Sequence, residues 1–178
     1  MIDNNINKNE IFPKLATIHR LSDKYSGMCP SGCTLCEDRE TLMLLPCEDE
    51  FIHENSEKDQ TNMFFKDKCG FCYQPKGFAC PMLHSSGTCK VYKTRPFDCR
   101  SFPVVPRFQL DKSNSIEFFL TDSYCPILNN LSSKFIKTTI DCWQSIAENL
   151  PADWKIMYNK LNQHCYNNKI PEESYNNP

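Results

Sequence analysis

The sequence lacks the features that would place the protein in a membrane or on a nucleic acid. It has no stretch of about 18 apolar residues, and residues 1–8 have neither the basic head nor the apolar run of a secretory signal. The formal net charge is only -2, so no basic field attracts nucleic acid or an anionic membrane surface. We therefore expect a cytoplasmic protein that binds neither nucleic acid nor membrane.

Several familiar catalytic and repeat patterns are also missing. The chain has no glycine-rich phosphate loop, no Walker-type lysine and no internal repeat at a solenoid period. No Ser-His-Asp or Cys-His arrangement can be placed together from the sequence. These absences leave cysteine as the residue type that carries the chemistry.

Twelve cysteines occur in a chain of 178 residues. The cytoplasm keeps thiols reduced, and disulfide scaffolds are commonly shorter than about 80 residues, so metal ligation or redox work explains the number better than a disulfide framework. Most of the cysteines fall between Cys29 and Cys99. Zinc and iron-sulfur clusters select such soft sulfur ligands.

The length and the local patterns predict one small α+β domain. Residues 1–10 are rich in asparagine and are expected to be a loose leader, residues 11–170 form the cysteine-cluster domain, and residues 171–178 form a disordered tail. Within the domain, metal-bound loops are expected over about 29–126 and helices over about 126–166.

Short elements are expected inside and after the loops. The apolar run at residues 42–46 predicts a buried strand, and a short helix is expected around Phe51 and Ile52. Glycine and proline recur from Cys69 to Pro106, which predicts loops wrapped around metal. Residues 107–110 and 116–120 then flank a polar segment, which predicts a β-hairpin.

The last third of the chain switches to helical spacing. Apolar residues three or four apart over residues 128–150 predict an amphipathic helix with Pro126 in its first turn. Pro151 opens a second helix, and the two are expected to pack as a helical hairpin. Cys142 and Cys165 lie in the apolar stripes of these helices, so we expect them to pack in the core.

The first cysteine group reads C-x-x-x-C-x-x-C over residues 29–36. Such short spacing lets one turn of backbone aim several sulfurs at one point, and three thiols leave at least one coordination position to be filled from elsewhere. Radical S-adenosylmethionine enzymes contain the same run. That reading is disfavoured because complete β/α barrels need about 250 residues and no alternating strand-helix series is present.

A second set of motifs follows. Residues 80–83 read CPML, residues 87–92 read GTCKVY, residues 95–103 read RPFDCRSFP, and Cys125 precedes a proline. Together with residues 29–36, these motifs resemble the cysteine-cluster family known as YkgJ-type or CxxCxxCC proteins, which is described as a zinc- or iron-chelating domain. The resemblance covers about residues 29–126, and the R-P-x-x-C-R block is its most specific part.

Carried over position by position, the resemblance implies a set of metal ligands: Cys29, Cys33, Cys36, Cys80, Cys89, Cys99 and Cys125. The sequence departs from the family pattern in two places, since the family's first cluster commonly ends in a Cys-Cys pair and has a first gap one residue shorter. Glu37 stands at the last position of that cluster and can supply an oxygen ligand instead. Alternatively, a further sulfur fills the vacancy, from Cys47, Cys69 or Cys72.

Cys69 and Cys72 form a C-x-x-C pair that suits either a metal site or a redox pair. The redox version needs a helix directly after the pair, whereas Pro75 and Gly77 follow, so we predict that both cysteines are metal ligands. His84 is a further candidate, since it lies between two predicted ligands and can complete a mixed sulfur-nitrogen site.

Basic residues outnumber acidic ones over residues 76–107, where Asp98 is the single acid. Arg95 and Arg100 flank Cys99, and we predict that they offset the negative charge of a thiolate site and tune its reduction potential. The same stripe can instead bind an anionic substrate or partner, or be a solvated face.

Two hypotheses for function follow. The first is a protein that holds an iron-sulfur cluster or another polynuclear iron site, for redox chemistry or for modification of a partner protein; some relatives in the resemblance are associated with protein lysine methylation. The second is a module in which zinc holds the loops together and whose task is to bind another protein.

Overall fold

The protein divides into two compact units, Met1–Arg100 and Ser101–Pro178. The computed structural model describes residues 8–23, 42–55, 64–66, 71–74, 89, 92, 94–111, 115–121, 128 and 131–173. Helices and small antiparallel sheets make up these residues, so the predicted α+β class is confirmed. The sequence predicted one domain and gave no sign of the division after Arg100.

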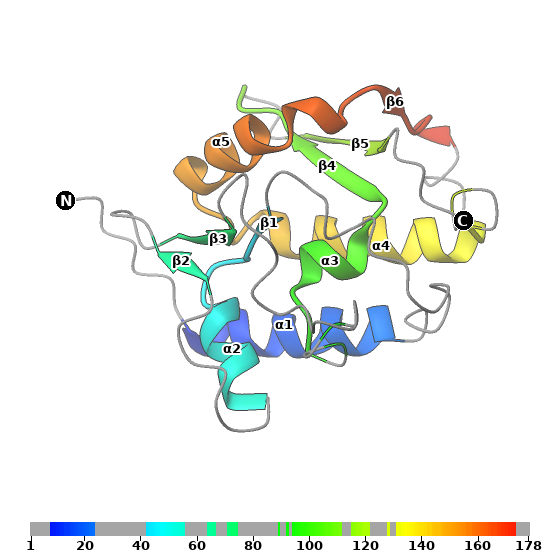
Figure 1. Ribbon diagram of the computed structural model, residues 1–178. Coiled ribbons are helices and arrows are strands. Elements are labelled where there is room, and N and C mark those ends of the chain that lie inside the picture. The colour runs from blue at the N-terminus through cyan, green and yellow to red at the C-terminus, as the bar shows by residue number, and fades with distance from the viewer. Residues whose placement is uncertain are drawn as a thin grey trace. The chain divides into compact units, whose positions relative to one another are not determined.

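The first unit contains short helices and a small antiparallel sheet (Figure 1). Its described elements are α1 (Lys8–Asp23), β1 (Leu42–Met43), α2 (Glu48–Asn55), β2 (Phe65–Lys66), β3 (Cys72–Gln74) and α3 (Phe97–Ser101), which ends one residue beyond the unit. The strand order is β1-β3-β2, and Tyr73 of the central strand pairs with Met43 on one side and with Phe65 on the other.

Helix α1 forms because it has an apolar stripe to bury. Ile11, Leu15 and Ile18 are buried, and their spacing of four and three residues places them on one face. Residues 8–10 belong to this helix, so the prediction of a loose leader is wrong for them. The burial of this stripe stabilises the helix more than the low helix propensity of the asparagine-rich start destabilises it, since most helical stability in proteins comes from packing.

The strand and the helix expected over residues 42–52 are confirmed. Residues 42–46 are buried, β1 occupies the first two of them, and α2 carries the buried Phe51 and Ile52. Helices α1 and α2 contact each other through aromatic rings, since the ring of Phe51 lies 6.0 Å from Phe12 and 4.8 Å from His19.

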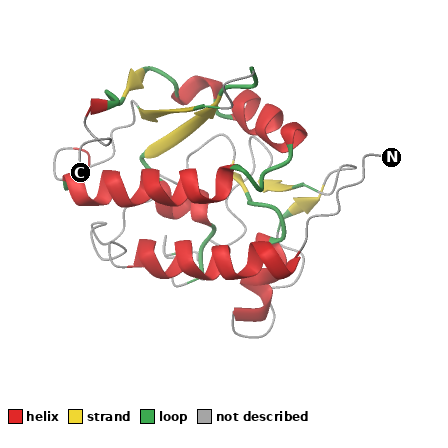
Figure 2. Cartoon of the chain, turned by 180° about the vertical axis from the view of Figure 1, so that it is seen from behind, coloured by secondary structure: helices red, strands yellow, loops and turns green. Residues whose placement is uncertain are grey.

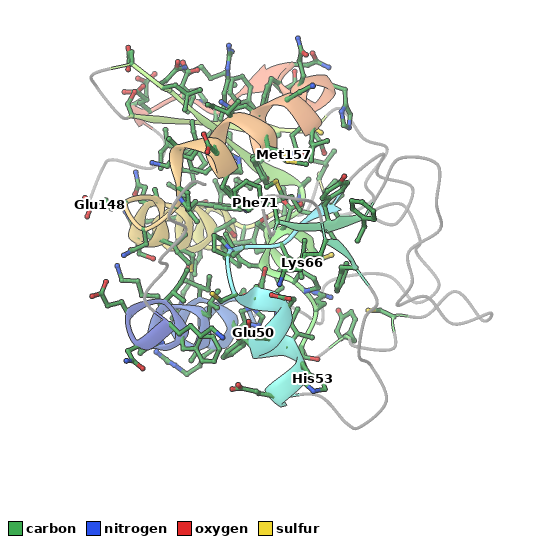
Figure 3. All side chains as sticks on the ribbon, turned by 90° about the vertical axis from the view of Figure 1, so that its left-hand side faces the viewer. Glu50, His53, Lys66, Phe71, Glu148 and Met157 are labelled. Atoms are coloured by element: carbon green, nitrogen blue, oxygen red, sulfur yellow. The ribbon has the colours of Figure 1, made fainter. Side chains whose placement is uncertain are left out.

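The outer face of α2 carries charged side chains. Figure 3 labels Glu50 and His53 on this helix and Lys66 on β2. Lys8 of α1 pairs with Glu50, and Lys66 Nζ lies 3.7 Å from Asp49 Oδ2. These pairs are at the surface, where ion pairs contribute little to stability.

The second unit is a three-stranded antiparallel sheet with two helices that both contact β4. Its elements are β4 (Val104–Phe108), β5 (Ile116–Leu120), α4 (Ser133–Ala147), α5 (Ala152–Leu161), the 3-10 helix η2 (Gln163–Cys165) and β6 (Asn168–Lys169). The strand order is β4-β5-β6, and Figure 1 shows β4 and β5 side by side.

The predicted hairpin is confirmed, although β4 starts earlier than expected. Val104 and Val105 are buried and pair with β5, so regular structure begins inside the segment predicted to be loops. Pro106 is tolerated because β4 is an edge strand. The elements β3 and α3 also lie within that segment, which corrects the prediction of loops from Cys69 to Pro106 where the structure describes it.

The two predicted C-terminal helices are present. Helix α4, one of the two long helices seen in Figure 2, begins at Ser133 rather than near Pro126, because Ser132 caps it by accepting the Phe135 N–H at 3.1 Å. Helix α5 follows Pro151 as expected. Cys142 and Cys165 are buried, which confirms their prediction as core residues.

Aromatic rings fill the space between the helices and β4. The centre of the Phe108 ring lies 6.2 Å from that of Trp143, 5.9 Å from that of Trp154 and 5.7 Å from that of Tyr158. Trp143 and Tyr158 also contact each other, which joins α4 to α5. Among the described residues, no helix is both long and apolar enough to cross a bilayer.

Candidate functional site

A fully buried carboxylate connects three segments of the first unit. Glu48 stands at the start of α2, and its Oε1 atom accepts the Phe97 N–H at 2.6 Å and lies 2.8 Å from Nε2 of His19. Its Oε2 atom accepts the Leu45 N–H at 2.9 Å, while the Glu48 N–H returns to the Leu45 carbonyl. The side chain thereby joins α1, the turn before α2, and α3.

The second half of this network lies in α3. Asp98 is fully buried and its Oδ2 atom accepts the Met43 N–H at 3.4 Å. Arg100 is also buried, and it donates from Nε to the Arg95 carbonyl at 2.8 Å and from a terminal nitrogen to the His19 carbonyl at 3.3 Å. Buried polar groups are tolerated only when hydrogen-bonded, so these partners fix the segment in place.

Cys99 lies between the two anchored residues Asp98 and Arg100. Its N–H donates to the Pro96 carbonyl at 3.0 Å, and its half-buried side chain packs against an apolar cluster. This cluster consists of Leu42, Leu44, Ile52 and Cys72, and Phe64 also packs on it. Two predicted ligands that are far apart in the sequence, Cys72 and Cys99, therefore meet at one apolar surface.

The fit to a metal centre can be tested on these two residues. Thiolate sulfur is the donor that zinc, iron and iron-sulfur clusters share, and both side chains are in the thiol form rather than in disulfides. An apolar surround suits a metal centre because it controls solvent access and dielectric. The chemistry of both side chains suits such a group, and its further ligands would have to come from other residues.

The other described cysteines of the first unit are half-buried. Cys89 lies in a single β-bridge. Cys47 adopts a left-handed backbone conformation, with φ of 62°, directly before α2. Burial raises the pKa of the Cys47 thiol, and the nearby Glu50 raises it further. Such a thiol is a weaker source of thiolate than an ordinary cysteine.

Several predicted ligands lie outside the described residues: Cys29, Cys33, Cys36, Cys69, Cys80 and Cys125. The alternative ligands Glu37 and His84 lie outside them too. Within the described part of the chain, no group of three His, Cys, Asp or Glu side chains is close enough to hold a metal ion. The nine-cysteine ligand set therefore stays a prediction.

The two arginines predicted beside the metal have different surroundings. Arg100 is buried and donates to the carbonyls of Arg95 and His19, so it connects the segment that carries Cys99 to α1. Arg95 is half-buried and stacks its guanidinium 4.2 Å from the centre of the Tyr92 ring. Their predicted role of offsetting thiolate charge stays a prediction.

Sequence reasoning missed His19 and Glu48, which hold the network together. His19 follows the apolar stripe of α1 at helical spacing from Ile11 and Leu15, which is a signal for a buried histidine. Glu48 opens an acidic first turn of α2, which is typical of a helix N-terminus. Their pairing joins distant segments and has no local signal.

Comparison of the chain with known proteins finds no match to a family model, a curated protein or a solved structure.

Proposed function

We propose that the protein is a metal-binding cysteine-cluster protein that holds an iron-sulfur cluster or another polynuclear iron site in its first unit. The observation that supports this most is that Cys72 and Cys99 approach one apolar cluster from separate segments. Metal sites need such convergence of distant ligands, whereas ordinary buried cysteines do not.

The chemistry of the segment around Cys99 adds support. Residues 95–100 read RPFDCR, the part of the sequence that most resembles the YkgJ-type family. Asp98 and Arg100 are both buried and hydrogen-bonded, so the residues on either side of Cys99 are fixed in place. Buried polar side chains are tolerated where they are hydrogen-bonded, and here they hold the main chain next to Cys99.

The bound iron would serve redox chemistry or the modification of a partner protein. A cluster supplies electron transfer when it is bound, and the chain's own residues set its surroundings. Arg95 and Arg100 flank Cys99 in the sequence and lower the cost of negative charge on nearby thiolates. Eight of the nine predicted ligands belong to the first unit, and the ninth, Cys125, belongs to the second.

The test is purification without oxygen, followed by a visible spectrum and analysis for iron, zinc and sulfide. A brown protein with iron and sulfide supports the proposal. A colourless protein with zinc alone contradicts the iron site and supports a zinc module that binds another protein. A folded protein without either metal contradicts both.

The variant Cys99→Ala tests the ligand assignment, and Cys142→Ala is its matched control. Both substitutions remove one sulfur, but Cys142 is a core residue of the second unit. We expect Cys99→Ala to lose most of its metal and Cys142→Ala to keep the wild-type metal content per folded molecule. Equal metal content in the two variants would show that Cys99 is not a ligand.

A further inference from the structure

We propose that Glu48, together with His19, is the positioning residue that holds the Cys99 thiol at the apolar cluster. This inference rests on the proposed function for its metal readout, and it also has a readout that needs no metal.

Glu48 anchors the start of α3 through a hydrogen bond from its first residue. Helix α3 is five residues long, too short to be stable by itself, so its place depends on anchors from elsewhere. The first anchor is the Phe97 N–H, which Glu48 accepts at 2.6 Å. Cys99 lies two residues further along the same short helix, so a shift of Phe97 moves the thiol.

Two more anchors act on either side of the thiol. Asp98 bonds to the Met43 N–H of β1, and Arg100 bonds to the His19 carbonyl of α1. Strand β1 and helix α2 supply Leu42 and Ile52 of the apolar cluster. Glu48 stands at the start of α2, which carries Ile52 of the apolar cluster, and its carboxylate bonds to α3, which carries Cys99. The cluster and the cysteine are therefore both connected to this buried side chain.

His19 completes the arrangement. Its ring is buried, it lies edge-on to Phe51 at 4.8 Å, and Nε2 is 2.8 Å from Glu48 Oε1. The same residue presents its carbonyl to Arg100. His19 therefore supports both ends of the segment that carries Cys99, one through its side chain and the other through its main chain.

Glu48→Gln is the sharpest variant, because it keeps the shape and removes one acceptor. The carboxylate receives the Phe97 and Leu45 N–H groups on different oxygens, whereas an amide offers one oxygen and turns an NH2 group toward the other donor. One main-chain N–H, that of Phe97 or that of Leu45, then loses its partner, so the connection that Glu48 makes between α3 and the turn before α2 is broken. Glu117→Gln is the matched control, since it makes the same change in the second unit.

The first readout is a titration of metal-free protein with Co2+, followed by the thiolate-to-cobalt absorption per bound ion. We expect Glu48→Gln to weaken Co2+ affinity by about 10- to 100-fold, as for other residues that orient ligands, and to alter the spectrum per bound ion. Glu117→Gln should match the wild type. Wild-type affinity and spectrum in Glu48→Gln would overturn the positioning role.

The second readout is site-resolved alkylation of metal-free protein with iodoacetamide, measured by mass spectrometry. We expect Cys99 to react at least about tenfold faster in Glu48→Gln, since local opening exposes the thiol. Cys142 reports on unfolding of the second unit and the buried Cys72 on unfolding of the first, and neither should accelerate by the same factor as Cys99. Acceleration of Cys142 by the same factor, or no acceleration of Cys99, would overturn the positioning role.

If Glu48→Gln does not fold, two variants of His19 decide the matter. His19→Ala removes the side-chain contact but keeps the main-chain carbonyl, and His19→Gln restores a nitrogen donor near the place of Nε2. We expect the alanine variant to accelerate Cys99 alkylation and the glutamine variant to return it toward the wild-type rate. Equal rates in both variants would overturn the positioning role.

A wild-type protein without thiolate-to-cobalt absorption contradicts the proposed function, while the alkylation result still tests the positioning.

Discussion

Different kinds of interaction stabilise the interior of each of the two units. In the second unit, Phe108, Trp143, Trp154 and Tyr158 form a cluster of aromatic rings between one strand and two helices. In the described part of the first unit, the side chain that joins most segments is the carboxylate of Glu48. The second unit thus depends on aromatic packing, whereas the first unit combines apolar burial, as in the stripe of α1, with a buried hydrogen-bond network.

The cysteines differ in the same way. Cys142 and Cys165 of the second unit are buried among apolar side chains, whereas in the first unit Cys72 is buried and Cys47, Cys89 and Cys99 are half-buried. A thiol in an apolar core contributes to packing, while a half-buried thiol beside fixed polar groups is accessible to a ligand. The second unit thus places its described cysteines in an apolar core, whereas the first unit leaves most of its described cysteines partly exposed.

The largest effect is expected from Trp143→Ala in the second unit. Removal of a fully buried indole leaves a cavity and lowers the free energy of unfolding by about 3–5 kcal/mol. The two tryptophans of the chain both lie in the second unit, so fluorescence of the remaining Trp154 during urea unfolding reports on that unit. Ile156→Ala, which changes a half-exposed side chain of α5, is the control. A loss no greater than that of the control would contradict the aromatic core.

The next effect concerns the Cys142 thiol, whose pKa burial raises to about 12, with Asp141 adding to the shift. The thiolate fraction near pH 8 is then about 1000-fold below that of an ordinary cysteine. We expect iodoacetamide to leave Cys142 unmodified in the folded protein and to modify it in urea. Modification at similar rates with and without urea would show that this thiol is not part of a stable core.

The smallest effect is expected at Glu117, where a hydrogen bond from Lys169 lowers the pKa, and one from Gln109 contributes. Because the folded pKa lies below the unfolded one, the contribution is present above the ordinary carboxyl range and is lost as pH falls through the folded pKa. Glu117→Gln should remove this acid dependence and lower the free energy of unfolding at neutral pH by less than about 1 kcal/mol. Urea midpoints of wild type and variant, compared at neutral and acid pH, test this. If the variant keeps the wild-type dependence of stability on acid pH, the prediction is wrong and other carboxylates cause that dependence.

Local patterns in the sequence predicted the second unit well. The hairpin and both helices have clear periodicity, and Pro151 marks the start of α5. Helix α4 begins later than predicted because Ser132 is its cap, and a cap is decided by local geometry that spacing alone does not give. Helix α1 was missed because its start is rich in asparagine and Pro13 interrupts the pattern, although its buried stripe shows helical spacing.

The site could be predicted only in part. The motif around Cys99 identified the segment, and Arg100 within it was singled out for charge compensation. The structure shows that this side chain also bonds to main-chain carbonyls, because a buried guanidinium needs hydrogen-bond acceptors, and its predicted role beside a thiolate site stays a prediction. The contact of Phe97 with Glu48, and of Glu48 with His19, joins residues distant in the chain, so no local pattern could have indicated it.

Hydrogen exchange on metal-loaded and chelator-stripped protein tests the contrast between the units most directly. We predict that metal removal lowers amide protection in α1, α2 and α3 of the first unit and leaves β4, β5, α4 and α5 of the second unit unchanged. Equal loss of protection in both units, or no loss in either, would contradict the proposal that the first unit depends on metal while the second is stable through its aromatic core.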